Sequence, residues 1–447
     1  MTNWVAMSNL LGFAERNVPR YTSYPTAPHF SAAVGPAEYS QWISELPADA
    51  ALSLYVHVPY CTELCLYCGC TTKAVRRREP IERYAGRVIE EISLLTELAS
   101  RKVVRLHWGG GTPSILGAKR FIEITTRLAA CFDFSRLAEH AIELDPRALD
   151  ESLVRTLAAI GVTRASLGVQ DFSPHVQQAI GRVQPFETVA RSVDGLRAAG
   201  IIDLSFDLMY GLPHQNVADV ARSAVLAASL APQRIALFGY AHVPWFRVQQ
   251  RRIDAAALPG LTARLEQARV AAETLSAAGY IPIGLDHFAK PDDELAIAAR
   301  EGRLHRNFQG YTTDAADALI GLGASAISRL PQGFVQNAPD VAGYTRAIAA
   351  KQLATVRGVR ISDDDRRRGA IIERLMCDLA VNLDQIAPNI SFEAETAALD
   401  PFVHEGLVRI EARRITITEN GRPFVRLVAA AFDNYLATKP HGHSVAV

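Results

Sequence analysis

Four of the six cysteines lie within ten residues of one another. The spacing C-x3-C-x2-C-x-C belongs to Cys61, Cys65, Cys68 and Cys70, in the run CTELCLYCGC. Thiolates bind zinc and iron–sulfur clusters, and a pair separated by two residues also occurs in redox dithiols. Structural zinc sites usually take their ligands from two separated pairs, and a dithiol leaves two of these cysteines unused. An iron–sulfur cluster uses the chemistry of the run best, so we favour it.

The other two cysteines, Cys131 and Cys377, stand alone in helical patterns, and we expect them to be small core residues. The first residues, MTNWVAMSNLLGFAERN, show no basic leader and no cleavage pattern. No stretch approaches the roughly 18 to 20 apolar residues that span a bilayer. We therefore expect a cytoplasmic protein without a membrane span, in which thiols stay reduced and the cysteines serve a purpose other than disulfides.

A regular alternation of strand and helix patterns surrounds the cysteine run. Six short apolar or alternating segments are each followed by a segment with the helical period. The expected strands cover 53–58, 103–108, 140–145, 162–170, 202–211 and 234–243. The expected helices cover 81–99, 119–131, 150–161, 175–199, 217–229 and 260–278. Such alternation is typical of a parallel sheet with helices outside it.

Each of the six expected strands ends in a motif with glycine, proline or polar residues. In chain order these motifs are HVPYC, GGGTP, ELDPR, GVQDF, YGLP and YAHVP. The C-terminal ends of parallel strands meet at one edge of the sheet, where the ligand sites of parallel barrels and open α/β sheets lie. We therefore expect the cysteine run, which follows the first strand, to share one site with the other five motifs.

The segments on either side of this alternation differ from it. Residues 1–38 are rich in proline and predict an ordered N-terminal arm, followed by a catalytic domain at 39–355. Residues 356–447 show helical patterns and the stretch GLVRIEARRITITENGRPF, which predicts a hairpin turning at Asn420–Gly421 before a last helix. We predict an α/β fold: an incomplete parallel (β/α)6 barrel with an N-terminal arm and a small, mainly helical C-terminal domain.

The charge balance excludes one class of partner. Lys plus Arg and Asp plus Glu each number 47 among the 447 residues, so a chain with no net charge is not built around nucleic acid. Only 6 of the 47 cations are Lys. Genomic base composition explains such an excess of Arg, and so does the recognition of carboxylates by rigid guanidinium forks.

The cysteine spacing after a strand resembles the signature of the radical S-adenosylmethionine superfamily. The resemblance implies that Cys61, Cys65 and Cys68 ligate three irons of a [4Fe–4S] cluster. It also implies that the fourth iron stays open for S-adenosylmethionine, whose reductive cleavage yields a 5′-deoxyadenosyl radical. An open metal position of this kind is the general arrangement of a catalytic site.

The motifs also resemble a narrower family, the oxygen-independent coproporphyrinogen III oxidases. The run from PRYTSYPTAPHF through YVHVPYC, LHWGGGTP, GVQDF, DLMYGLP, YAHVP and GLDHFAKPDDELA to LHRNFQGYTT covers residues 19 to 313. The resemblance implies an oxidoreductase of haem and porphyrin biosynthesis. Its substrate is a tetrapyrrole, coproporphyrinogen III, and two propionates become vinyl groups with loss of two CO2, giving protoporphyrinogen IX.

The resemblance further implies two S-adenosylmethionine sites. The positions that match the cluster-bound molecule are Tyr55, Gly110, Glu143 and Ile327. The positions that match the second molecule are Tyr67, Gly111, Thr112, Gln170, Arg182, Asp207 and Ala241. The residue types are compatible, because glycines allow close approach of the backbone and a carboxylate in the apolar run IDLSFDLMYG needs a partner if it is buried. Arg182 could pair with the carboxylate of an amino-acid ligand.

Three residues near the motifs leave alternatives open. Cys70 belongs to the narrower family's pattern, and we consider both a catalytic role on the substrate side and a spare structural thiol. Arg20 and Tyr21, in the arm, could cover the site, sense the substrate or pack as part of an N-terminal strap.

Two alternative functions share the features above. One is a haem-binding chaperone on the same scaffold, against which Cys70 and the motifs PRYTSYP and NFQGYTT argue. The other is an iron–sulfur protein of electron transfer alone, which would need a fourth cysteine ligand. For the oxidase we expect an electron donor outside the chain, a monomeric state and no nucleic-acid partner.

Overall fold

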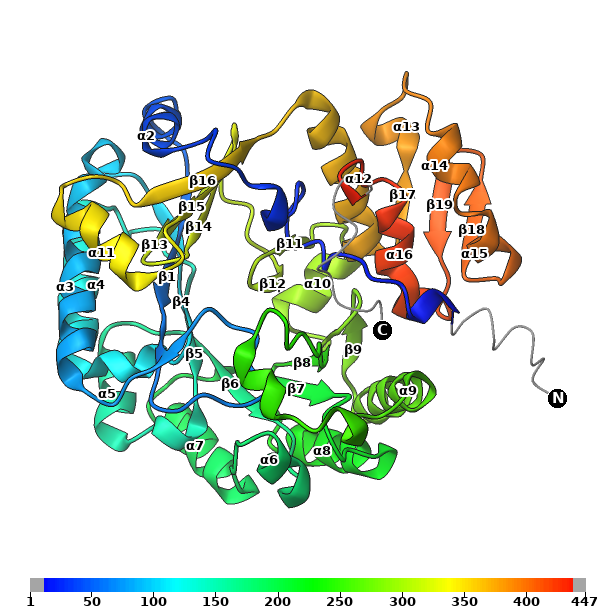
Figure 1. Ribbon diagram of the computed structural model, residues 1–447, viewed down its shortest axis with the longest axis horizontal. Helices are drawn as coiled ribbons and strands as arrows, with labels where there is room; N and C mark the ends of the chain where they lie inside the picture. Colours follow the sequence, from blue (N-terminus) through cyan, green and yellow to red (C-terminus); the bar gives the residue numbers. More distant parts are fainter. Residues whose placement is uncertain (1–11, 437–447) are drawn as a thin grey trace.

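One mixed sheet of twelve strands dominates the computed structural model, which describes residues 12–436 (Figure 1). Seven of its strands run parallel and side by side. In spatial order they are β13 (Ala318–Leu322), β1 (Leu52–Val58), β4 (Val103–Gly110), β5 (Glu139–Leu144), β6 (Arg164–Gln170), β7 (Asp203–Tyr210) and β8 (Arg234–Gly239). The α/β class and the six predicted parallel strands are confirmed. The seventh, β13, comes from the glycine-rich segment ALIGLGASAISRL.

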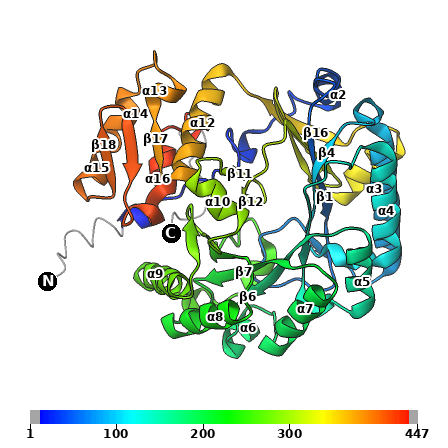
Figure 2. The same ribbon diagram turned by 180° about the vertical axis from the view of Figure 1, so that it is seen from behind.

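Helices cover the outer side of the parallel strands (Figures 1 and 2). They are α3 (Arg78–Leu94), α4 (Gly117–Cys131), α5 (Glu151–Ala159), α7 (Phe186–Ala198), α8 (Val217–Ser229) and α9 (Leu261–Ala277). In α3 the buried side chains Ile81, Tyr84, Ala85 and Val88 recur at helical spacing, so one apolar face packs on the sheet. Leu52, Leu54 and Val56 of β1 belong to the same core.

The predicted helix at 175–199 is two helices, and this prediction was wrong. The segments are α6 (Pro174–Ala179) and α7, separated by Gly181 in the left-handed region at φ +65° and by Pro185. Glycine in that conformation ends a helix, and Pro185, with ψ 151°, is the non-helical N-cap residue after which α7 starts at Phe186.

Antiparallel strands extend the sheet at both edges. Next to β13 lie β14 (Ile327–Leu330), β15 (Gly333–Asn337) and β16 (Thr355–Arg360), and next to β8 lie β10 (His287–Ala289) and β9 (Ile281–Ile283). The order ends at β16 and β9, so within the described residues the sheet stays open.

The C-terminal elements form a smaller layer beside the sheet. Its helices are α12 (Asp363–Asp378), α13 (Leu383–Ile386), α14 (Glu393–Ala397), α15 (Asp400–His404) and α16 (Val425–Ala430). Its sheet has the order β17 (Ala380–Asn382), β19 (Arg414–Ile417), β18 (Val408–Glu411). The predicted hairpin exists, but its turn at Asn420–Gly421 was wrong. Glu411 pairs with Arg414, so the turn falls at Ala412, whose φ is +52°.

The N-terminal arm packs with these C-terminal elements. Phe13, Val18, Tyr21 and Tyr24 are buried in one apolar core with residues of α12, α15 and α16, and Figure 1 shows the blue arm beside the red helix. Two elements follow the arm's start: a short 3-10 turn at Ala27–His29 and α2 (Pro36–Ser44). Residues 1–11 of the predicted arm and 437–447 of the predicted C-terminal domain lie outside the described residues.

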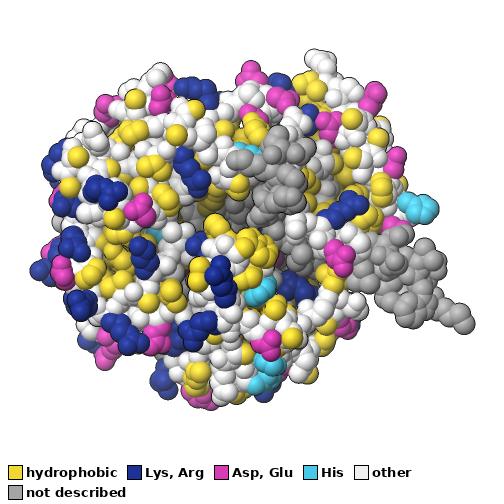
Figure 3. Space-filling view, viewed as in Figure 1, with side chains coloured by type: hydrophobic (Ala, Val, Ile, Leu, Met, Phe, Trp, Pro, Cys, Tyr) yellow, Lys and Arg dark blue, Asp and Glu magenta, His cyan; other side chains and the backbone are white. Residues whose placement is uncertain are grey.

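The six cysteines are free, as expected. No helix of residues 12–436 is long and apolar enough to cross a membrane. On the face shown in Figure 3, Lys and Arg side chains are dispersed, with acidic side chains between them.

Candidate active site

A cavity of about 590 Å³ opens at the C-terminal ends of the parallel strands. Of the fifteen residues predicted for the site, thirteen line it. They are Cys61, Cys65, Tyr67, Cys68, Cys70, Gly110, Gly111, Thr112, Glu143, Gln170, Arg182, Asp207 and Ala241. Five of the six strand-end motifs, HVPYC, GGGTP, ELDPR, GVQDF and YAHVP, thus contribute residues to one cavity, whereas no residue of YGLP lines it.

The cysteine run forms a loop whose base is closed by backbone pairing. The short strand β2 (Tyr60–Cys61) pairs in parallel with β3 (Lys73–Ala74), so residues 62–72 are held as one loop at the end of β1. The amide of Leu66 donates to the carbonyl of Ile180, which fastens the loop to α6. Three cysteines are thus presented by one loop from neighbouring positions.

Hydrogen-bond donors surround the sulfurs of the first three cysteines. Thr112 Oγ1 donates to Cys61 Sγ at 3.3 Å, and an amide at residue 70 lies 3.4 Å from Cys68 Sγ. Cys65 Sγ accepts from Nη1 of Arg182 at 3.5 Å. Donors of this kind stabilise thiolates, which is the form that ligates iron.

The donor set therefore fits an iron–sulfur cluster. Soft thiolates from one loop face a roomy cavity and are stabilised by hydrogen bonds. Within residues 12–436, no group of three His, Cys, Asp or Glu side chains is placed so that it could hold a single metal ion.

The hydrogen bond between the two last sulfurs distinguishes Cys70 from Cys68. This bond and the backbone amide of Cys70 lower the pKa of Cys68 to about 7, despite burial. The same bond, followed by burial, raises the pKa of Cys70 well above its ordinary value. Cys70 thus keeps its proton while Cys68 loses its own more readily. Cys70 lines the cavity and is exposed to it, while the protein groups around its sulfur cause the desolvation that raises its pKa.

The glycines after β4 are needed for packing against protein. A Cβ on Gly110, whose φ is +118°, would lie 2.8 Å from Nδ1 of His57 and 2.9 Å from the carbonyl oxygen of Val58. A Cβ on Gly111 would lie 2.5 Å from the carbonyl oxygen of Tyr60. Because glycine has no side chain, the backbone of β1 and β2 can lie against Gly110 and Gly111. We had expected these glycines to make room for a ligand instead.

Glu143, at the end of β5, is held as a carboxylate. Nε2 of His107 donates to Oε1 at 3.2 Å, and the amide of Gly110 donates to Oε2 at 3.0 Å. Burial raises the pKa of Glu143, but the hydrogen bond and charge of His107 outweigh it, and the net pKa is lowered. A Cβ on Gly109 would lie only 2.7 Å from Oε1 of Glu143, so glycine at position 109 makes room for this carboxylate.

Asp207, on β7, is half-buried and lightly bonded. Ser166 Oγ donates to its Oδ2 over a long distance of 3.5 Å. Burial, and then the charge of Glu143, raise the pKa of Asp207 to about 7. Such a group is ready to exchange hydrogen bonds with a polar ligand.

Arg182 has more protein partners than the sequence suggested. It donates to the carbonyl of Gly168 at 2.7 Å, to Asp145 Oδ2 at 3.2 Å and to Cys65. Its Nε is buried and has no hydrogen-bond partner among the described residues. A ligand carboxylate would therefore share Arg182 with Asp145.

Gln170 reaches the cavity through an unusual backbone conformation. Its φ of +68° interrupts the register between β6 and β7, where Gly168 pairs with Asp207 and Gln170 pairs with Leu208. Non-glycine residues in this region are uncommon and cluster at functional sites. On the opposite wall, Gln250 donates to the carbonyls of Tyr67 and Ala241 and so joins the cysteine loop to the segment after β8.

Two predicted residues lie outside the cavity lining. Tyr55 Oη is 2.9 Å from Nδ1 of His57, and its ring stacks on His107 at 5.8 Å, one contact away from Glu143. Ile327 starts β14 and lines a different cavity, of about 430 Å³.

The two arm residues have different outcomes. Arg20 lines the cavity with the cysteines, whereas Tyr21 does not. Tyr21 is buried and donates to Asp433 at 3.1 Å, which is the packing interpretation of the arm.

The analysis of single motifs missed several neighbours of the site. His57, His107, Asp145 and Arg147 contact the predicted residues, and Ser166 lines the cavity. His57, His107, Asp145 and Arg147 lie within the motifs HVPYC, LHWGGGTP and ELDPR. Their polarity at the strand ends was therefore the signal that could have found them.

Comparison with known proteins agrees with this geometry. A model of the radical SAM superfamily matches residues 55–227, which hold the cysteine loop and the strands β4 to β7. The fold and the loop of three thiolates thus define a radical S-adenosylmethionine protein.

Full-length relatives narrow the class. Oxygen-independent coproporphyrinogen III oxidases of Bradyrhizobium diazoefficiens and Paracoccus denitrificans are 48% and 44% identical to this chain. Each match covers 98% of this chain and 99% or 98% of the relative. The solved structure of coproporphyrinogen III oxidase from Escherichia coli, a radical SAM enzyme, matches with a TM-score of 0.89 and 37% identity. It covers 93% of this chain and 98% of that one. This chain belongs to the family of oxygen-independent coproporphyrinogen III oxidases.

Proposed function

We propose that this protein catalyses the anaerobic oxidative decarboxylation of coproporphyrinogen III to protoporphyrinogen IX. In each of two propionates, the β-carbon gives up a hydrogen atom, the side chain then releases CO2, and one electron passes to an acceptor outside the protein, leaving a vinyl group. The observation that carries the proposal is the loop of three hydrogen-bonded cysteines at the strand ends, in a chain that matches these oxidases over nearly its whole length.

The thiolates of Cys61, Cys65 and Cys68 would hold the [4Fe–4S] cluster. When bound, the cluster and S-adenosylmethionine supply a 5′-deoxyadenosyl radical that removes hydrogen from carbon. The chain's own part is to position the reactants and to exclude water. The walls around the loop serve this purpose, because the buried strands β4 to β7 enclose it on one side.

We assign Glu143 and Gly110 to the cluster-bound S-adenosylmethionine, with Tyr55 and Ile327 behind them. The support is that Glu143 is a carboxylate on the cavity wall, able to accept hydrogen bonds from an amine or from ribose hydroxyls. Tyr55 would act through its stacking on His107, which fixes Glu143. Ile327 lies further away, so its assignment depends on the family pattern alone.

We assign a second S-adenosylmethionine molecule to the part of the cavity around Asp207. Its proposed neighbours are Tyr67, Gly111, Thr112, Gln170, Arg182 and Ala241. The support is that all of them line the same cavity and that the half-buried Asp207 accepts a long hydrogen bond from Ser166. The buried Nε of Arg182, which has no hydrogen-bond partner among residues 12–436, is a further donor in this lining.

Cys70 is proposed to act on the substrate side. It lines the cavity and is exposed to it, whereas the three proposed iron ligands are less exposed. We further propose that residues 39–355 form the catalytic unit and that the arm 1–38 and residues 356–447 close it. The shared core of arm and C-terminal elements supports this division. The electron that S-adenosylmethionine cleavage consumes would come from a donor outside the chain.

The test is anaerobic turnover by the reconstituted protein with coproporphyrinogen III, S-adenosylmethionine and a reductant. Mass spectrometry should show that the product is lighter than coproporphyrinogen III by two CO2 and four hydrogen atoms. The Cys65→Ser variant serves as a control without a cluster. Tight binding of haem together with no turnover would favour the chaperone alternative.

A further inference from the structure

A second cavity, of about 680 Å³, lies beyond the end of the catalytic cavity and has no role in the site described above. It is enclosed by the ends of β7 and β8, by α9 and β10, and by the segment that leads into α16. Four residues line both cavities: Arg20, Gly239, Tyr240 and Ala241. The two spaces are therefore neighbours with a common wall at the end of β8.

The walls of this second cavity are largely apolar. Leu237, Leu265, Pro282, Leu285, Phe288 and Phe424 contribute to its lining. Its volume lies within the range of about 300 to 1,000 Å³ that is usual for small-molecule sites. The cavity is thus suited to a ligand with a large apolar body.

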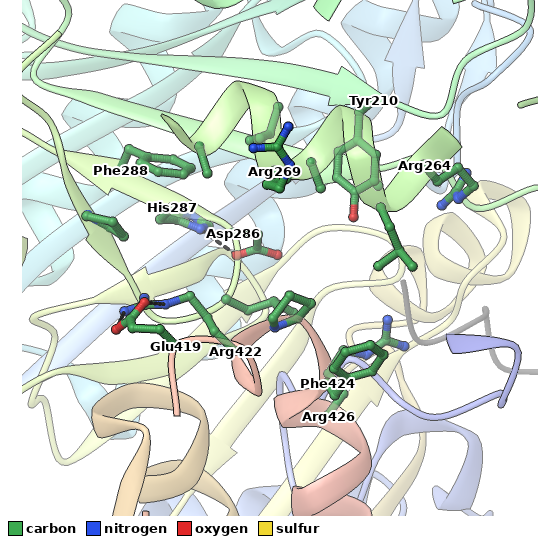
Figure 4. A pocket seen from close by; sticks show the side chains of 18 of the residues that line it. Tyr210, Arg264, Arg269, Asp286, His287, Phe288, Glu419, Arg422, Phe424 and Arg426 are labelled. Atoms are coloured by element: carbon green, nitrogen blue, oxygen red, sulfur yellow. Dashed lines mark hydrogen bonds and ion pairs between the residues drawn. The ribbon is translucent and has the colours of Figure 1, made fainter. Parts of the chain in front are cut away.

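Several charged residues of the lining are occupied by each other. Arg422 pairs with Glu419 at 3.1 Å and donates to the carbonyl of Gly284, and Arg269 pairs with Glu273 and Glu266. Figure 4 shows the pair Glu419–Arg422 at one side of the cavity. These guanidinium groups are committed to the protein.

Four other arginines reach the cavity lining from distant parts of the chain; two of them also donate to backbone carbonyls, Arg426 to those of Val18 and Pro19 and Arg20 to that of Gly239. Arg20 lies in the arm, Arg264 on α9, Arg306 on β11 (His305–Asn307) and Arg426 on α16. Burial, and then the charges of Arg20 and Arg306, lower the pKa of Arg426 to about 9. Burial and the charge of Arg20 also lower the pKa of Arg264. Arg20 is therefore close enough to repel Arg264 and Arg426, and Arg306 is close enough to repel Arg426.

One carboxylate stands among these arginines. Asp286 precedes β10 and is bonded to Nδ1 of His287 at 2.8 Å, as Figure 4 shows. Although burial acts the other way, His287, Arg306 and Arg20 hold the pKa of Asp286 at about 2. Over the whole lining, six arginines stand against four acidic residues, Glu273, Asp286, Glu405 and Glu419, so the cavity carries an excess of positive charge.

Arg306 has donors that the described residues do not use. Its side chain is only 5% exposed, and its Nη1 is 3.9 Å from Asp286 Oδ1, beyond hydrogen-bond distance. Nε and Nη1 are buried without a hydrogen-bond partner among residues 12–436. Nη2 of Arg306 makes a long contact of 3.4 Å with the carbonyl of Arg20, and the guanidinium carbon lies 4.4 Å from the centroid of the Tyr311 ring. Buried donors of this kind are costly unless a ligand satisfies them.

Gly239 brings Arg264 to the wall between the two cavities. A Cβ at this position would lie 3.3 Å from Nη2 of Arg264 and 2.9 Å from Oη of Tyr210. Arg264 also lies over the Tyr210 ring, with its guanidinium carbon 5.6 Å from the centroid. The guanidinium thus lies beside the common wall of the two cavities. Figure 4 shows Tyr210 and Arg264 on the same side of the second cavity.

We propose that this second cavity binds the tetrapyrrole substrate, with its macrocycle on the apolar walls and the carboxylates of its non-reacting propionates on Arg20, Arg264, Arg306 and Arg426. This assignment rests on the proposed function. The ligand class follows from the cavity's chemistry: a large apolar body bearing several carboxylates neutralises an excess of buried guanidinium groups. The reacting propionate would extend past Gly239 and Ala241 into the cavity with the cysteines.

The experiment measures steady-state kinetics with coproporphyrinogen III for the cluster-loaded protein and the variants Arg264→Gln and Arg306→Gln. Loss of a charge-assisted hydrogen bond should raise KM by about tenfold or more. Iron content and substrate-free cleavage of S-adenosylmethionine should stay at the level of the unaltered protein. Arg264→Lys should recover part of the loss. The matched control is Arg269→Gln, which lines the same cavity but removes a group already paired with Glu266 and Glu273.

A second measurement does not depend on the variants folding. The unaltered protein is given coproporphyrinogen III whose two non-reacting propionates are methyl esters, and kcat/KM should fall by about a hundredfold, because two carboxylates are removed. Arg306→Gln should discriminate less between acid and ester. Equal kcat/KM for acid and ester, an unchanged KM in both Gln variants, or an equal effect of Arg269→Gln would overturn the inference. Failure of the unaltered protein to convert coproporphyrinogen III would instead refute the proposed function.

Discussion

Arg182 joins Asp145 to Cys65 through one nitrogen. Its Nη1 lies 3.2 Å from Asp145 Oδ2 and 3.5 Å from Cys65 Sγ, so the end of β5 and the cysteine loop share one cation. The loop is therefore oriented by a residue of a different segment, and a charge-assisted hydrogen bond reaches one of the proposed iron ligands.

Replacing Arg182 should loosen the cluster. In Arg182→Gln we expect iron to pass to a chelator several-fold faster under argon, because the Cys65 thiolate loses its closest cationic donor. The rate is followed by the absorbance of the iron–chelator complex. Arg147→Gln is the matched control, since its contact with the same sulfur is longer, at 3.8 Å. Equal rates in the two variants would contradict the role given to Arg182.

The three proposed iron ligands should behave alike and differently from Cys70. Cys61→Ser, Cys65→Ser and Cys68→Ser should each lose iron and the broad visible absorbance of the cluster, because a hydroxyl is a poor substitute for a soft thiolate. Cys70→Ser should keep both. Iron analysis and absorbance spectra after anaerobic reconstitution measure this. Iron loss in Cys70→Ser equal to that in the others would make Cys70 a ligand and leave no open iron.

Asp207→Ala should reduce turnover much more than iron content. Removing this carboxylate deletes a hydrogen-bonding group of the proposed second S-adenosylmethionine site, while the sulfurs keep their own donors. The unaltered protein should cleave two S-adenosylmethionine molecules for each protoporphyrinogen formed. Quantifying 5′-deoxyadenosine against product checks both expectations. Undiminished turnover in Asp207→Ala would exclude the residue from the site.

Glu91, on α3, should make the protein's stability depend on pH. The side chain is buried and accepts hydrogen bonds from the amide of Gly323, from Tyr344 Oη and from Asn337 Nδ2. Burial, opposed by these bonds, raises its pKa from 4.5 to about 7. Because the folded state binds the proton more tightly, this contribution is full below about pH 4.5 and is lost as the pH rises through 7.

This rise in the pKa of Glu91 corresponds to a contribution of about 3 kcal/mol to the free energy of unfolding. The free energy of unfolding of the unaltered protein, measured in urea, should therefore fall relative to that of Glu91→Gln between pH 5 and 8. The difference between the two proteins removes the contribution of all other titrating groups. A difference that stays constant over this range would show that Glu91 titrates normally.

The sequence alone determined the elements and motifs that depend on local pattern. Six strands and the helices after them follow from periodicity within short windows, so they could be predicted to within a few residues, apart from the break at Gly181 and Pro185. The cysteine loop is equally local, because its members lie within ten residues of one another. The common edge of parallel strands then placed thirteen of fifteen predicted residues around one cavity.

The tertiary structure decided everything that depends on contacts between distant segments. Arg20, Arg264, Arg306 and Arg426 meet only because the arm and α16 pack in one core beside the sheet. The same applies to Ile327, which pairing of β14 with β13 carries to another cavity, and to Gly110 and Gly111, whose missing side chains make room for the backbone of β1 and β2. Periodicity and spacing describe a residue's own neighbourhood, whereas a cavity is the sum of surfaces that the chain brings together only when its core is buried.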